Sequence, residues 1–229
     1  MRRIKGRQVG RVQPVLGLDA NVRSEVVYQP IGQMPRPASD ARQRIVQAAL
    51  ALFAARGYHN TGIADILKES GAKRGSLYHH FSSKRELGLA AIDEMALLLA
   101  EQGAVRHLRT DGHPIDQMLR MVDDLPGVVK LPSGEALTPS VAVRLGAVEA
   151  EFRERLSIRY MEIMREVEAT LRRGVAEGQI VESVDPRVLS RMFAVMCQGI
   201  QSMIVLGVQE AMWEDARHWL KAYLESLRN

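Results

Sequence analysis

The chain has 229 residues, of which 46% are hydrophobic, 25% charged and 5% aromatic. This is the mix of a globular protein, and the abundance of Ala, Leu, Met, Glu and Arg favours helix over sheet. The single cysteine excludes an intrachain disulfide and fits a reducing compartment. No apolar run approaches the roughly 18 residues that a membrane span needs. We therefore expect a cytoplasmic protein without a secretory signal or a membrane span.

The formal net charge of +4 is unevenly distributed. Residues 1–38 carry seven Lys or Arg against two acids, residues 39–88 carry eight against four, and residues 89–229 carry sixteen against twenty-one. Because the N-terminal part is basic and the C-terminal part is acidic, we expect a polyanion to bind only to the N-terminal part. Random surface charge is the alternative explanation of this feature taken alone.

The first segment, residues 1–38, contains four prolines and no sustained apolar period, so we expect a largely disordered basic arm. Because Met34 lies just before the first predicted helix, a start codon assigned too far upstream is an alternative explanation for the arm.

The first predicted helix begins at residue 39 or 40, where Asp40 and Gln43 make a capping-box pattern. Apolar residues then recur at helical spacing on one face: Ile45, Ala48, Ala49, Leu52 and Phe53. Gly57 is expected to end this helix.

Two short helices and a long one follow. Thr61 is expected to cap a second helix that ends at Gly71, and a third opens around Arg74. Ser83 and Glu86 form another capping box, which starts a long helix running to about residue 107. Because each of the first three helices is too short to be stable alone, they must share one small core, which predicts a helix-turn-helix.

The sequence signals for the remaining helices are less regular. Pro114 is expected at the first position of a helix that reaches residue 125, and residues 126–140 form a loop-rich stretch without a β pattern. A long helix is predicted from about residue 148 to Gly178. Asp185 and Pro186 then begin a helix that is apolar almost all round, and a final helix presents apolar residues from Met212 to Leu227.

We call residues 1–88 the basic half and residues 89–229 the acidic half. Three stretches of the basic half, residues 57–67, 71–81 and 83–87, have their glycine, aromatic, hydroxyl and basic residues at the spacings of a known family. They closely resemble the DNA-binding region of the tetracycline-repressor (TetR) family. The resemblance implies an all-α fold in which a helix-turn-helix DNA-binding domain is joined by a long helix to a C-terminal helical ligand-binding and dimerisation domain. The expected division is an arm at 1–38, a DNA-binding domain at 39–88 and an effector-binding and dimerisation domain at 89–229.

The resemblance assigns DNA contacts to Thr61, Gly62, Lys73, Arg74, Gly75, Ser76, Tyr78, His79, His80 and Lys84. The cap of the second helix faces a phosphate, long cations at the start of the third helix reach a phosphate or a guanine edge, and Gly75 lets the backbone approach the duplex. His80 and Lys84 match phosphate clamps. Lys73 departs from the family, which commonly has a small hydroxyl residue there, so a cap is lost and a cation gained.

Other side chains of this region have different expected roles. Four apolar residues of the second and third helices are assigned to the core: Ile63, Leu67, Leu77 and Phe81. By resemblance the arm could lie along the minor groove or the backbone of DNA. Adjacent positions on a helix diverge by about 100°, which argues against a metal site at His79 and His80.

The acidic half is rich in methionine, which suits a pocket for a largely apolar small-molecule effector, although an ordinary helical core is the better explanation for any single Met. The resemblance places the effector between helices of this half. The pocket candidates are Met118, Met121, Phe152, Tyr160, Met164, Phe193, Met196 and Cys197. Arg144 is either a partner for an acidic effector or a surface residue. Cys197 is either a redox sensor or, as its apolar neighbours suggest, a buried inert thiol.

The last two helices are more apolar than a monomer can cover, which predicts a homodimer through them and a near-palindromic double-stranded DNA operator. The sequence thus predicts a repressor that an effector releases from DNA. A regulator controlled by a protein partner, or without ligand, remains the alternative. An enzyme is not expected, because no nucleophile elbow, phosphate loop, cofactor fingerprint or metal-spaced set is present. Asp123 and Asp124 are taken as solvated surface.

Overall fold

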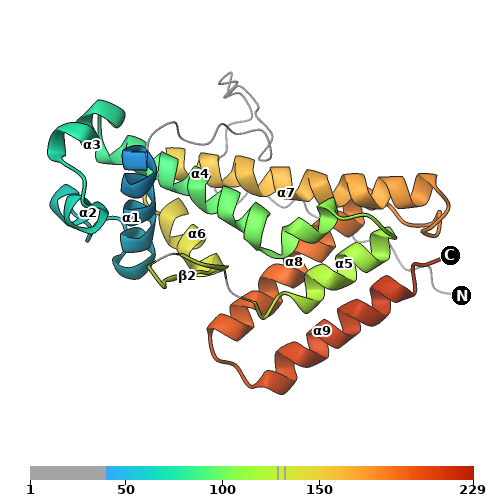
Figure 1. Cartoon of the computed structure of the whole chain (residues 1–229). Coiled ribbons are helices and arrows are strands. Elements are labelled where there is room, and N and C mark those ends of the chain that lie inside the picture. The colour runs from blue at the N-terminus through green and yellow to red at the C-terminus, as the bar shows by residue number, and fades with distance from the viewer. Residues whose placement is uncertain (1–39, 128, 132) are drawn as a thin grey trace, which may run out of the picture.

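The computed structural model describes residues 40–127, 129–131 and 133–229, and within them the regular structure is helical apart from one small hairpin and one isolated β-bridge between residues 180 and 228 (Figure 1). The basic half forms α1 (Asp40–Arg56), α2 (Ile63–Ser70), α3 (Arg74–His80) and α4 (Lys84–Gln102). The acidic half forms a 3₁₀ helix (Ala104–Arg109), α5 (Pro114–Asp123), β1 (Val129–Lys130), β2 (Ala136–Leu137), α6 (Pro139–Gly146), α7 (Ala150–Ala176), α8 (Pro186–Val205) and α9 (Glu210–Glu225). The predicted arm, residues 1–38, lies outside the described residues.

Several predicted helix ends are confirmed by their hydrogen bonds. The Ser83 hydroxyl accepts the backbone N–H of Glu86 (3.1 Å) at the start of α4. The Asp185 carboxylate accepts the backbone N–H groups of residues 187 and 188 (2.9 and 3.2 Å) at the start of α8. Gly57 and Gly71, which follow α1 and α2, have φ angles of +84° and +64°, a left-handed conformation that glycine adopts without steric cost.

Two predicted details of the first and fourth helices are wrong. The side chain of Gln43 donates to Glu94 of α4 (2.6 Å) and so takes no part in a capping box with Asp40. The fourth helix ends at Gln102 instead of near residue 107, because the backbone turns extended at Gly103. The guanidinium of Arg106 donates to the carbonyl oxygens of residues 102 and 103 (2.6 and 3.0 Å), which supports the chain where the helix ends.

The stretch predicted as loop, residues 126–140, holds the hairpin and the first two residues of α6. Val129 pairs with Leu137 and Lys130 with Ala136 in an antiparallel register. Strands of two residues have no detectable apolar period, so the pattern gave no signal for them. The hairpin is held instead by long-range packing, since Leu131 and Leu137 are buried against the basic half.

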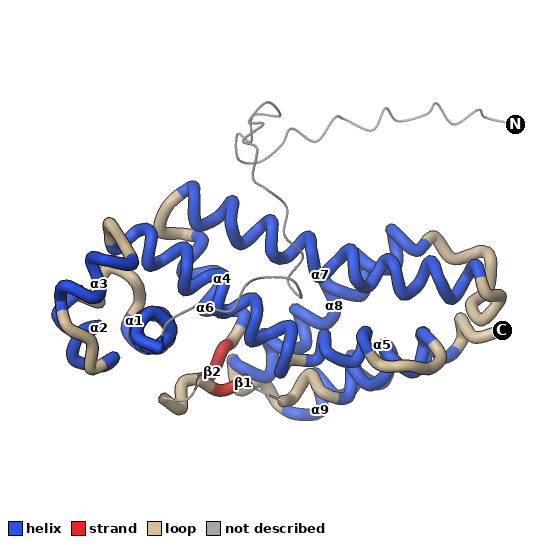
Figure 2. The backbone as a smooth tube through the Cα atoms, turned by 45° about the horizontal axis from the view of Figure 1, so that its top comes forward, coloured by secondary structure: helices blue, strands red, loops and turns tan. Residues whose placement is uncertain are grey.

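The apolar side chains gather into two cores. The first lies among α1 to α4 and also takes in the hairpin, α6 and the start of α7. The second lies among α5, α7, α8 and α9. In Figures 1 and 2 the hairpin and α6 lie between the α1–α3 end of the molecule and the α8–α9 end. The helix α7 therefore belongs to both cores, its N-terminal part to the first and the rest to the second.

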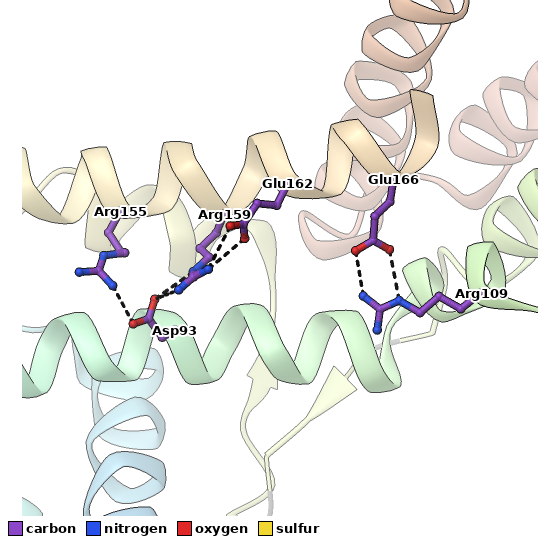
Figure 3. Close-up of polar contacts among 6 residues, drawn as sticks. All are labelled: Asp93, Arg109, Arg155, Arg159, Glu162 and Glu166. Atoms are coloured by element: carbon purple, nitrogen blue, oxygen red, sulfur yellow. Dashed lines mark hydrogen bonds and ion pairs between the residues drawn. The ribbon is translucent and has the colours of Figure 1, made fainter. Parts of the chain in front are cut away.

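Charged side chains join α4 to α7 along their length (Figure 3). Asp93 of α4 receives Arg155 (2.9 Å) and Arg159 (2.9 Å) of α7. Arg159 also pairs with Glu162 (3.0 Å), which is buried. Farther along, Arg109 of the 3₁₀ helix pairs with Glu166 (2.9 Å). The guanidinium of Arg159 therefore gives the buried carboxylate of Glu162 a partner in a nearly dry position.

Candidate nucleic-acid interface

Helix α3 presents one buried and one exposed face. Leu77 and Phe81 are buried in the first core, as predicted. On the other face Lys73, Arg74, Gly75 and His79 are exposed, and Tyr78 is 47% exposed. Ser76 and His80 are partly exposed. This helix therefore presents cations and hydrogen-bond donors to solvent, while its apolar face packs in the core and fixes its position.

The start of α3 is shaped by Lys73, Arg74 and Gly75. Lys73 precedes the helix in an extended conformation and makes no side-chain cap bond, as expected where the family's hydroxyl is missing. The guanidinium of Arg74 lies 5.7 Å from the ring centroid of Tyr78, a cation–π distance that orders both exposed side chains. A side chain at residue 75 would meet nothing within 4 Å, so the backbone there is open to an approaching surface.

Lys84, at the first position of α4, is tied to the loop before α2. Its ammonium donates to the carbonyl oxygen of Tyr58 (2.7 Å) and lies 4.2 Å from the centroid of the Tyr58 ring. Partial burial lowers the pKa of Lys84 and raises that of Tyr58. Sequence reasoning missed Tyr58, although an aromatic residue directly after a helix-ending glycine was a visible signal.

Thr61 corrects the sequence analysis. The residue before the first turn of α2 is Gly62, whose backbone N–H is accepted by the Asp65 carboxylate (2.8 Å). The Thr61 hydroxyl instead donates to the carbonyl oxygen of Gly57 (2.9 Å), and the residue is only 1% exposed. Its side chain is therefore a buried support of the loop, whereas the exposed Gly62 stays available at the surface.

The rings of the two adjacent histidines of α3 lie edge to face, with 5.0 Å between their centroids. Within the described part of the chain, no three His, Cys, Asp or Glu side chains are grouped so that they could hold a metal ion.

The effector-pocket candidates do not form one cavity. Four of them are buried in the second core: Met118, Met121, Met164 and Phe193. Phe152 lies apart from them in the first core, against Tyr58, because it stands at the start of α7. Tyr160 is partly exposed and, with Met164, lines a hollow of about 210 Å³ between α7 and α8. Phe193 and Met196 line a groove of about 520 Å³ between α8 and α9.

The remaining singled-out residues have structural partners. Burial raises the pKa of the Cys197 thiol to about 12, which favours the inert alternative over the sensor. Arg144 donates to the carbonyl oxygen of Ala54 in α1 (2.7 Å), so its guanidinium is already engaged. Asp123 pairs with Lys221 (2.7 Å), and Asp124 with Arg106 (2.5 Å), so both aspartates are more than solvated surface.

An apolar stripe covers the outer faces of α8 and α9. On α8 it runs through Val188, Met192, Val195 and, past the helix end, Leu206; on α9 it runs through Met212, Trp219 and Tyr223. All seven are at least 40% exposed. By length and apolar composition α8 also meets the criterion for a membrane-crossing helix, as core helices of soluble proteins often do.

Residues 45–91 match the family model of bacterial regulatory proteins of the tetR family. The regulator LmrA of Bacillus subtilis is 49% identical over 57 residues, which cover 24% of this chain and 30% of LmrA. The transcriptional regulator AcuR of Cereibacter sphaeroides is 28% identical over 181 residues, 76% of this chain and 82% of AcuR. Residues 45–91 thus belong to a DNA-binding domain of the TetR family.

Solved structures agree with this membership over most of the fold. A TetR transcriptional regulator from Chloroflexus aurantiacus superposes with a TM-score of 0.68 at 26% identity and covers 82% of this chain and 96% of that one. A regulator from Saccharomonospora viridis, solved in complex with choline, superposes with a TM-score of 0.63 at 24% identity, over 81% and 95% of the two chains. The TetR-family fold thus extends through the acidic half, whereas the family model matches residues 45–91. The chain spans less than a third of the length of LmrA.

Proposed function

We propose that this TetR-family protein is a cytoplasmic, homodimeric DNA-binding repressor, released from a near-palindromic operator by a small-molecule effector. The exposed face of α3 carries the proposal. Lys73, Arg74 and Tyr78 stand on a helix whose opposite side is locked into the core by Leu77. Cations and hydrogen-bond donors on a rigid, protruding helix suit insertion into the major groove.

The other proposed DNA contacts flank that helix. The exposed start of α2 at Gly62 and Lys84 at the start of α4 offer the first backbone N–H groups of a helix and an ammonium for phosphates on either side of the groove. The N–H of Gly62 itself already donates to the Asp65 carboxylate. The ammonium of Lys84 is already held by Tyr58, which lowers the entropy that it would lose on binding.

The apolar stripe on α8 and α9 supports the homodimer. Isolated exposed apolar residues are ordinary, but a continuous stripe along two adjacent helices signals an interface. Two copies packed through this stripe form a four-helix bundle, and their two-fold axis presents two α3 helices to two half-sites. A partner on the stripe also accounts for the apolar character of α8 without a membrane.

An effector site is proposed in the acidic half, at the hollow between α7 and α8 that Tyr160 and Met164 line. The two flexible methionines of that hollow, Met161 and Met164, suit an apolar molecule. The choline complex of the Saccharomonospora viridis protein is an example of a small molecule bound to a protein of this fold.

The test is selection of duplexes from a random DNA library by the full chain, followed by footprinting and binding at increasing salt concentration. We expect a near-palindromic site and an affinity that falls steeply with salt. The Lys73→Ala and Tyr78→Ala variants should lose the site while remaining dimeric. A salt-independent response or the recovery of no duplex rejects DNA binding. A compound panel that never weakens binding rejects the effector and favours control by a protein partner.

A further inference from the structure

The ring of Phe152 fills a notch in the basic half although it comes from α7. It is fully buried, and its centroid lies 5.1 Å from that of Tyr58 in an edge-on arrangement. A methyl group added at Gly88 of α4 would lie 2.2 Å from the ring Cζ and 3.1 Å from the Tyr58 ring. The notch therefore exists only because residue 88 has no side chain.

Tyr58 links this notch to the proposed DNA contact at Lys84. Its ring packs between Phe152 and Phe53, with centroids 5.1 Å away on each side. Its carbonyl oxygen accepts the ammonium of Lys84. Because Lys84 and Gly88 are one helical turn apart on α4, the ring in the notch sets how closely Tyr58 approaches the turn that carries Lys84.

Two polar contacts also join the acidic half to the basic half. The guanidinium of Arg144 donates to the Ala54 carbonyl oxygen near the end of α1. Arg85 of α4 pairs with Glu151 (3.1 Å), the residue before Phe152. The Arg85–Glu151 pair is half exposed and contributes little to stability, so the buried ring is the contact that fixes the position.

We infer that Phe152 is a positioning residue for DNA binding, which transmits the placement of α7 through Tyr58 to Lys84. The inference rests on the proposed function. The same helix supplies Val167 and Leu171 to the second core, so a rearrangement there displaces the ring in the notch. Packed side chains transmit such shifts because close-packed interiors have little free volume.

The test uses full-length protein and a fluorescein-labelled duplex recovered from the random library by the wild type. Gly88→Ala should expel the ring and weaken duplex binding at least tenfold. The slope of log affinity against log salt should become shallower by about 0.9 for each phosphate that the variant no longer neutralises. Adding Phe152→Leu removes ring atoms where the new methyl stands, so the double variant should recover affinity and slope.

Val122→Ala is the matched control, since it truncates a buried residue of the second core that lies on α5 and not on α7. It should lower the melting temperature while the folded protein keeps the wild-type affinity and salt slope. The inference is overturned if Gly88→Ala binds with wild-type affinity and slope, or if Phe152→Leu rescues nothing. Failure of the wild type to select any duplex rejects DNA binding itself, and this inference with it.

Discussion

The dimer proposal makes a quantitative prediction at Val195, which is 63% exposed in the middle of the apolar stripe. Val195→Ala removes two methyl carbons, each of which contributes about 0.8 kcal/mol when buried. Scaled by the exposed fraction that a partner would cover, the loss is about 1 kcal/mol in each protomer, or about 2 kcal/mol for a symmetric dimer. The dimer dissociation constant should therefore rise roughly 30-fold.

Sedimentation equilibrium over a concentration series measures that constant. Val143→Ala is the matched control, because Val143 is 71% exposed on α6, outside the stripe. It should leave the constant unchanged. Val195→Glu should abolish the dimer, since two carboxylates would be buried near the two-fold axis, while circular dichroism still reports a folded helix. Equal effects at the two valines, or a wild type that is monomeric at micromolar concentration, would refute the reasoning.

Three further predictions concern single side chains. Lys73→Ala should weaken operator binding and flatten its salt dependence without changing the oligomeric state, and loss of folding instead would mean that Lys73 is structural. Glu162→Ala leaves Arg159 with Asp93 alone in a nearly dry position, so it should destabilise the fold by roughly 2 kcal/mol. A thermal melt should then shift down by about 4–8 °C, whereas Glu166→Ala, in a more exposed pair, should shift it little. Cys197, with a pKa of about 12, is about one part in ten thousand thiolate at pH 8, so iodoacetamide should modify it only after unfolding, and rapid native labelling would contradict its burial.

Features that depend on neighbours in the chain were predictable. The buried and exposed faces of α3 follow from a helical period over eight residues, which separates Leu77 and Phe81 from Arg74 and Tyr78. The cap at Asp185 depends on amide groups two and three residues away. For this reason α3, the start of α8 and the apolar surplus of the last helices could all be predicted without coordinates.

Features that depend on distant partners were not predictable. As an aromatic residue Phe152 was a candidate for the effector pocket, yet it packs on Tyr58 and Gly88 of the basic half. Arg144 resembled a surface residue, yet it reaches the carbonyl oxygen of Ala54, 90 positions earlier. Thr61 has the residue type of a helix cap, yet the fold turns its hydroxyl inward.

The sequence alone therefore determined most of the helices, the polarity of their faces and the family that they resemble, because these follow from short-range periodicity and residue type. Only the tertiary structure decided that α7 contributes residues to both cores. It also decided that the Phe152 ring of the acidic half packs against Tyr58, which holds the proposed DNA contact Lys84. Such contacts arise where close packing brings together side chains whose separation along the chain carries no local signal.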